Sequence, residues 1–179
     1  GGSAGWEYVT TITNPSNVAY IDYDFDTTYN HFLLMTTGWR TTDTYSLSNP
    51  KIKVSFKTNS STLYSGYYAG QQTYFDGGFN DQNSFDFSQL AVSGTAYADC
   101  PSVKFEMWDV KDSTTHTRFE ASGGTKYNFS GSSATVNGYV WHKMGQANTP
   151  GTFTGVRFFH NGSSSNIQSG TKIKIWGML

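Results

Sequence analysis

Apolar side chains occupy every second position in several short segments of this chain, and this alternation constrains the fold more than any other feature. In the segment 51–57, isoleucine, valine and phenylalanine alternate with three lysines and a serine. In an extended strand the apolar side chains then face a core, while the lysines and the serine face water. The segments 103–108 and 172–176 alternate in the same way, and Trp108 falls on the outward-facing side. The pattern predicts antiparallel sheets with one wet face.

Turn-forming residues separate the strand-like segments, as in an all-β sandwich or barrel. No long segment has a convincing helical period. At 179 residues the chain suits one domain with a substantial core. We expect a flexible linker or tag remnant at residues 1–5 and a single β-sandwich domain at residues 6–179. The predicted strands cover residues 6–13, 18–25, 32–37, 51–58, 63–68, 85–91, 103–110, 117–121, 127–129, 139–143, 154–160 and 171–176.

Charge and cysteine content exclude several classes of function. The formal net charge is -1, so the chain lacks the electrostatic footprint of a protein that binds a nucleic acid backbone. Cys100 is the only cysteine, which excludes an internal disulfide and a four-thiolate metal site, and the four histidines occur singly. No apolar run of about 18 residues is present to span a bilayer. We expect no nucleic acid partner, no membrane insertion, no metal and no cofactor.

Three aspartates, Asp22, Asp24 and Asp26, alternate with apolar residues and share one face if the segment is extended. Calcium prefers such oxygen-rich sites, but an EF-hand loop also requires a glycine at its sixth position and a glutamate at its twelfth. Counted from Asp22, those positions hold Thr27 and Leu33. We interpret the aspartates as a solvated strand face, with calcium as the alternative.

Two segments, 66–83 and 122–138, read as long loops, which in a compact domain are usually functional or mobile. The first combines aromatic, amide and glycine residues, as a sugar site requires, because a sugar ring stacks on a flat aromatic side chain while polar groups fix its orientation. Similar platforms are offered by Trp39, which stands beside Arg40, and by Trp141. The alternative for each aromatic is packing onto the sheet. The candidate ligand-binding residues are Trp39, Arg40, Tyr67, Tyr68, Gln71, Gln72, Tyr74, Asp76, Trp108 and Trp141.

The sequence contains few signatures of catalysis. No Gly-x-Ser-x-Gly elbow is present, and Cys100 precedes a proline in a predicted turn. A glycosidase needs two carboxylates flanking a cleft, and the plausible ones here are Asp76, Asp81, Asp86 and Glu106. We therefore expect a protein without enzymatic activity.

The end of the chain carries a resemblance to a known family. It has Ile-Gln-Ser-Gly at 167–170, an alternating strand, and Trp-Gly-Met-Leu at 176–179. With Trp6 in an early strand and Tyr-Asn-His-Phe-Leu-Leu at 29–34, this pattern resembles the C-terminal β-sandwich domains of bacteriophage virion proteins, such as tail fibres and appendages. The resemblance implies a jelly-roll-like antiparallel sandwich on a virion.

The leading hypothesis is a fibre or virion-surface domain that attaches to the host cell by binding surface polysaccharide, with many weak sites acting together. Its expected partners are host polysaccharide and other virion proteins, in a homo-oligomer for which a trimer is favoured. One alternative is a structural virion module in a head decoration, a baseplate or a fibre tip. Another is a carbohydrate-binding module of a secreted enzyme, so the expected location is the virion or, in this last case, outside the cell.

Overall fold

The computed structural model describes residues 5–39, 51–59, 62–64, 67–73, 76–82, 85–89, 102–128, 136–160 and 166–179. For residues 51–53, 124–128, 136–143 and 160, and for the strands between residues 67 and 89, the description covers the backbone alone. The elements are strands: β1 (Glu7–Thr13), β2 (Tyr20–Asp24), β3 (His31–Thr37), β4 (Lys51–Lys57), β5 (Tyr67–Thr73), β6 (Asp76–Gln82), β7 (Phe85–Gln89), β8 (Ser102–Trp108), β9 (Arg118–Asn128), β10 (Val136–Ala147), β11 (Gly155–His160) and β12 (Lys172–Met178).

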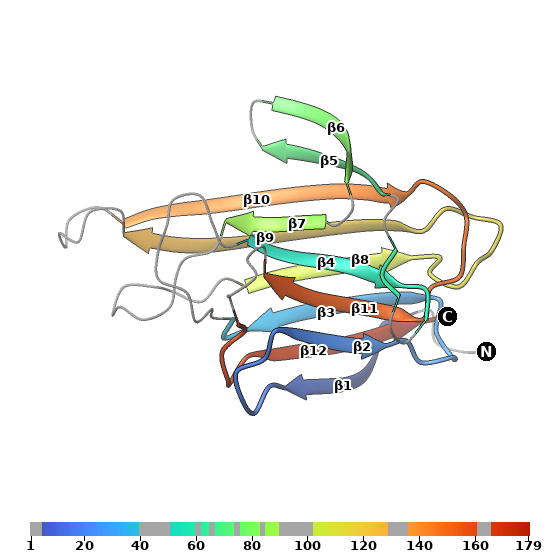
Figure 1. The fold of residues 1–179 in the computed structure, drawn as a ribbon, viewed down its shortest axis with the longest axis horizontal. Coiled ribbons are helices and arrows are strands. Elements are labelled where there is room, and N and C mark those ends of the chain that lie inside the picture. Colours follow the sequence, from blue (N-terminus) through green and yellow to red (C-terminus); the bar gives the residue numbers. More distant parts are fainter. Residues whose placement is uncertain are drawn as a thin grey trace.

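The strands form two antiparallel sheets (Figure 1). The larger sheet has eight strands in the order β1-β12-β3-β8-β9-β10-β5-β6, and the smaller has four in the order β2-β11-β4-β7. If the hairpins β5–β6 and β9–β10 are set aside, eight strands remain. If these eight strands are numbered 1 to 8 along the chain, one layer has the strand order 1-8-3-6 and the other has the order 2-7-4-5. This is the strand order of a jelly roll, so the predicted fold class is confirmed.

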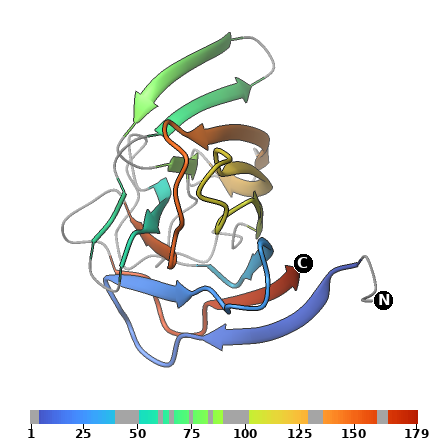
Figure 2. The same ribbon diagram turned by 90° about the vertical axis from the view of Figure 1, so that its right-hand side faces the viewer.

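The two additional hairpins extend the larger sheet beyond the jelly roll. The hairpin β9–β10 follows β8 directly, and β5–β6 joins the far side of β10. In the turned view of Figure 2, β5 and β6 lie at the opposite side of the molecule from β1.

These hairpins correct the expectation of two long loops. Residues 67–73 and 76–82 form β5 and β6 rather than a loop, β9 continues to Asn128, and β10 begins at Val136. The predicted strands 63–68, 117–121, 127–129 and 139–143 were accordingly misplaced or too short. Glycine and polar residues give these segments weak strand propensity of their own, but β10 pairs with β9 on one side and β5 on the other.

The core lies between the jelly-roll layers. In β8, Val103, Phe105 and Met107 are buried, as the alternation predicts, and Trp108 faces outward and is half-buried. Aromatic rings stack within the core, with centroids 4.5 Å apart for Phe25, which follows β2, and Phe32 of β3. Each fully buried large apolar side chain contributes about 1.5–3 kcal/mol relative to exposure.

The outer face of the smaller sheet differs from the prediction. Val54 and Phe56 are buried as expected, but Ser55 and Lys57, predicted to be wet, have only 2% of their surface exposed. Lys57 Nζ lies 2.5 Å from Asp24 Oδ1 and 3.4 Å from Asp22 Oδ2. Asp24 and Asp26 are exposed, as expected for a solvated face, but Asp22 and Asp24 also form an ion-pair network with Lys57.

Gly155 explains how Lys57 reaches a strand that is not its neighbour. In β11, Gly155 pairs with Lys57 of β4 on one side and with Asp24 of β2 on the other. Because Gly155 has no side chain, the lysine and the aspartate meet across β11. A Cβ at this position would lie 2.3 Å from the carbonyl oxygen of Tyr23 and 3.1 Å from Asp24 Oδ1.

Arg157 completes the network two residues further along β11, where it pairs with Asp22 of β2. Its Nε and Nη2 each donate a hydrogen bond of 2.7 Å to the carboxylate of Asp22, and its guanidinium lies 3.7 Å from the ring centroid of Tyr20. Burial alone would raise the pKa of Asp22, but the hydrogen bonds from Arg157 and the charges of Arg157 and Lys57 outweigh it and lower that pKa. The network therefore favours the ionised carboxylate.

Replacing Gly155 with alanine should destabilise the domain. The added Cβ would meet backbone atoms of β2, which cannot move away without disturbing the pairing of β2 with β11. We expect a loss of about 1–3 kcal/mol in the free energy of unfolding, measured by chemical denaturation. The control is Gly151→Ala, because a Cβ at Gly151 meets nothing within 4 Å. Equal losses for the two variants would contradict this account.

The Asp22 network should also weaken in acid. A carboxyl group whose pKa is lowered by folding stabilises the native state above its unfolded pKa, about 3.9, and loses that contribution as the pH falls through the folded value. We expect Asp22→Asn to lose about 1.5 kcal/mol at pH 7. This deficit relative to wild type should shrink as the pH falls below about 4. Denaturation curves across pH test this, and a deficit that is constant with pH would assign the effect to packing instead.

Candidate functional site

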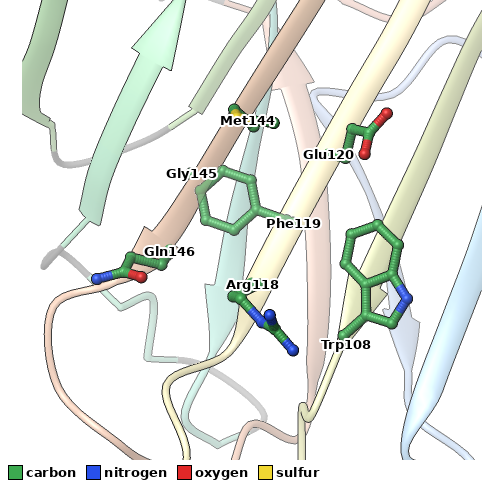
Figure 3. Close-up of a pocket in the computed structure, with 7 residues that line it drawn as sticks. All are labelled: Trp108, Arg118, Phe119, Glu120, Met144, Gly145 and Gln146. Carbon is green, nitrogen blue, oxygen red and sulfur yellow. The ribbon is translucent and has the colours of Figure 1, made fainter.

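A pocket of about 700 Å³ lies over β8, β9 and β10. Its lining residues, drawn in Figure 3, are Trp108, Arg118, Phe119, Glu120, Met144, Gly145 and Gln146. This pocket joins an aromatic side chain to charged and amide groups.

Strand register explains why these residues meet. Trp108 pairs with Arg118, and Arg118 pairs with Gln146 on its other side. Two residues further along β9, Glu120 pairs with Met144. These five positions alternate with buried ones, so their side chains share the outer face of the sheet.

Phe119 of β9 pairs with Gly145 of β10, between the pair Arg118–Gln146 and the pair Glu120–Met144. Phe119 is 2% exposed, and its ring centroid lies 5.7 Å from that of Phe56 and 6.1 Å from that of Phe105. The strand that carries Arg118 and Glu120 is therefore anchored in the core by the residue between them, and the pocket rests on a packed support.

The backbone after β8 fixes Trp108 and Arg118 relative to each other. Asp109 has a left-handed φ of 60°, and Thr117 Oγ1 donates a hydrogen bond of 2.9 Å to its carbonyl oxygen. Arg118 Nη2 lies 3.5 Å from Asp109 Oδ2, at the outer limit of a hydrogen bond. In Figure 3 the Arg118 side chain runs from β9 toward the strand that carries Trp108, and its guanidinium ends below the indole in this view. With 65% of its side chain exposed, Arg118 can donate to a ligand beside that ring.

Two carboxylates extend the polar character of this face toward β8. Glu106 pairs directly with Glu120, an arrangement of like charges that is unfavourable by itself. Lys104, on the same face of β8, forms an ion pair with Glu106 and offsets the repulsion. The face thus offers hydrogen-bond acceptors at Glu106 and Glu120, donors at Arg118, and both at Gln146.

The sequence-based candidates have different outcomes. Trp108 lines the pocket. Trp39 does not face a ligand: it is fully buried and packs on Phe158, with ring centroids 6.0 Å apart, so the prediction of a stacking platform there is wrong. The cause is Gly38, whose φ of 66° ends the alternation of β3 and turns the tryptophan inward. Arg40 and Tyr74 lie outside the described residues.

The remaining candidates are placed by backbone register. Tyr67, Tyr68, Gln71 and Gln72 belong to β5, Asp76 begins β6, and Trp141 lies in β10. Tyr68 pairs with Gln146, which extends the row of Trp108, Arg118 and Gln146 by one strand. Register thus brings one residue of the proposed aromatic segment next to the pocket.

Sequence reasoning missed Arg118, Glu120, Met144 and Gln146. Arg118 and Glu120 do alternate with the apolar Phe119 and Ala121, which is a usable signal for their outward direction. Met144 and Gln146 fell beyond the predicted end of the strand at residue 143, so their position beside β9 was hidden.

Comparison with known protein families, with curated proteins and with solved structures finds no match. In the part of the chain that the structure describes, no helix has the length and apolar character needed to cross a membrane. Within the same residues, no group of three or more His, Cys, Asp or Glu side chains is arranged to hold a metal ion.

Proposed function

We propose that this chain is a non-catalytic glycan-binding domain and that the pocket at Trp108 is its binding site. The observation that carries the proposal is the half-buried indole of Trp108 beside the exposed guanidinium of Arg118, with Glu120 and Gln146 within the same pocket. An indole face suits the apolar C–H face of a sugar ring, and the polar groups around it suit the hydroxyls. A jelly roll is a scaffold of lectins and of viral capsid proteins, but the fold alone does not assign a function.

The biological setting that we propose is attachment of a phage particle to host surface polysaccharide. It is supported by the resemblance of the chain ends to virion β-sandwich domains. Weak individual sites would suffice, because several copies on one particle raise the overall avidity. A carbohydrate-binding module of a secreted enzyme would use the same pocket, so the two settings differ in the glycan that is bound and not in the chemistry of the site.

Removal of the indole should weaken glycan binding without unfolding the domain. We expect the pre-multimerised wild-type domain to bind members of an array of bacterial surface polysaccharides, cellulose, xylan and chitin. Trp108→Ala and Arg118→Gln should each weaken that binding by about tenfold or more. The control is Tyr20→Ala, because Tyr20 is also an exposed aromatic, at 48%, but lies on the smaller sheet.

Two results would contradict the proposal: no binding to any polysaccharide, or an equal loss in the Tyr20→Ala control. Sedimentation velocity distinguishes glycan binding from the alternative of a structural virion module. An obligate oligomer that dissociates on Trp108→Ala, together with no glycan binding, would assign the pocket to subunit contacts.

A further inference from the structure

The outer face of the larger sheet carries a second aromatic site at a distance from the pocket. Tyr8 of β1 pairs with Trp176 of β12, and their rings meet edge to face with centroids 6.0 Å apart. The Tyr8 hydroxyl is 2.8 Å from Thr11 Oγ1, which orients the ring. Tyr8 is 59% exposed and Trp176 is half-buried. We call this pair, Tyr8 and Trp176, the aromatic ledge.

One continuous row of side chains connects the aromatic ledge to the pocket. Each residue of this row pairs directly with the next across neighbouring strands, from β1 to β10. The row consists of Tyr8, Trp176, Leu33, Glu106, Glu120 and Met144. Its last two members line the pocket.

The length of this row exceeds one sugar ring. Trp176 on β12 and Glu120 on β9 are three strands apart. Neighbouring strands are separated by about 4.8 Å, so the two backbone positions lie about 14 Å from each other. A ligand that contacts both the pocket and the aromatic ledge must therefore be a chain of several sugar units.

The chemistry of the row favours a glycan over a protein surface as its occupant. Glu106 and Glu120 lie in the middle of the row, directly opposite each other. The centre of a protein interface is depleted of charged residues, and an apolar partner would remove water from both carboxylates at a cost in desolvation. Sugar hydroxyls donate to carboxylates, while Leu33 and the aromatic ledge contact the C–H faces of the rings.

We propose that the ligand is an extended polysaccharide chain that crosses strands β9, β8, β3, β12 and β1. Trp108 binds one sugar unit, and the aromatic ledge binds another unit further along the chain. The domain then recognises internal segments of a polymer rather than a single terminal sugar. This proposal rests on the proposed function and adds the length and direction of the ligand.

The test measures affinity as a function of ligand length. The probes are the polysaccharide that the array identifies and its hydrolysis fragments, separated by size. The dissociation constant is measured by titration calorimetry for the wild type, Tyr8→Ala, Tyr8→Phe and Trp108→Ala. Tyr8 is chosen because its exposure makes loss of folding a minor concern, and Tyr8→Phe keeps the ring.

We expect wild-type affinity to rise with fragment length and then level off. Tyr8→Ala should weaken binding of long fragments by about tenfold and leave the shortest fragments unchanged, whereas Tyr8→Phe should retain most of the affinity. Trp108→Ala should weaken binding at every length. This combination supports the extended ligand.

Other outcomes overturn the proposal. If Trp108→Ala loses binding but wild-type affinity does not depend on length, or Tyr8→Ala has no effect, the pocket remains the binding site and the extended ligand is wrong. If no polysaccharide binds, both proposals fail. If Tyr8→Ala dissociates an oligomer in sedimentation velocity and leaves polysaccharide binding unchanged, the aromatic ledge is a contact between copies of the chain.

Discussion

The two sheets depend on the last two strands of the chain. β11 lies between β2 and β4 in the smaller sheet, and β12 lies between β1 and β3 in the larger sheet. β1 and β2 are edge strands whose hydrogen-bonded neighbours are β12 and β11. The inward side chains of these last strands, such as Phe158 and Ile175, are fully buried. Since the first strands pair with the last, the sandwich closes through contacts that are far apart in sequence, which is a slow-folding topology.

The same dependence gives the two sheets different outer faces. On the smaller sheet, β11 supplies Gly155 and Arg157, which allow Lys57 and Asp22 to form a network that covers the strand backbone. On this face the charged side chains already form ion pairs and hydrogen bonds with one another. On the larger sheet the outer face carries Trp108 and the aromatic ledge, whose apolar surface is partly in water. The larger sheet therefore carries the partly exposed aromatic side chains on which the proposed binding site depends.

Local sequence pattern was sufficient where each strand determines its own two faces. The alternation in β8 predicts both its buried residues and the outward direction of Trp108. It was insufficient for Lys57, because the partner Asp24 lies 33 residues away on a strand that is not adjacent. The pocket could not be predicted from local pattern for the same reason, because Arg118 and Gln146 meet Trp108 only through the register of three strands. Neither register nor the burial of Trp39 can be derived from the residues of one segment.

The pocket lies where the jelly roll meets its inserted hairpin. Trp108 is the last residue of β8, a jelly-roll strand, and the other lining residues belong to β9 and β10. The jelly roll can thus remain fixed by its core while the outward positions of the hairpin set the chemistry of the proposed binding site. Phe119 limits this freedom, because it packs on Phe56 and Phe105. In the proposed binding site, the chemistry of the pocket can therefore change at Arg118 and Glu120, on either side of Phe119, while Phe119 itself must stay large and apolar to keep the pocket in place.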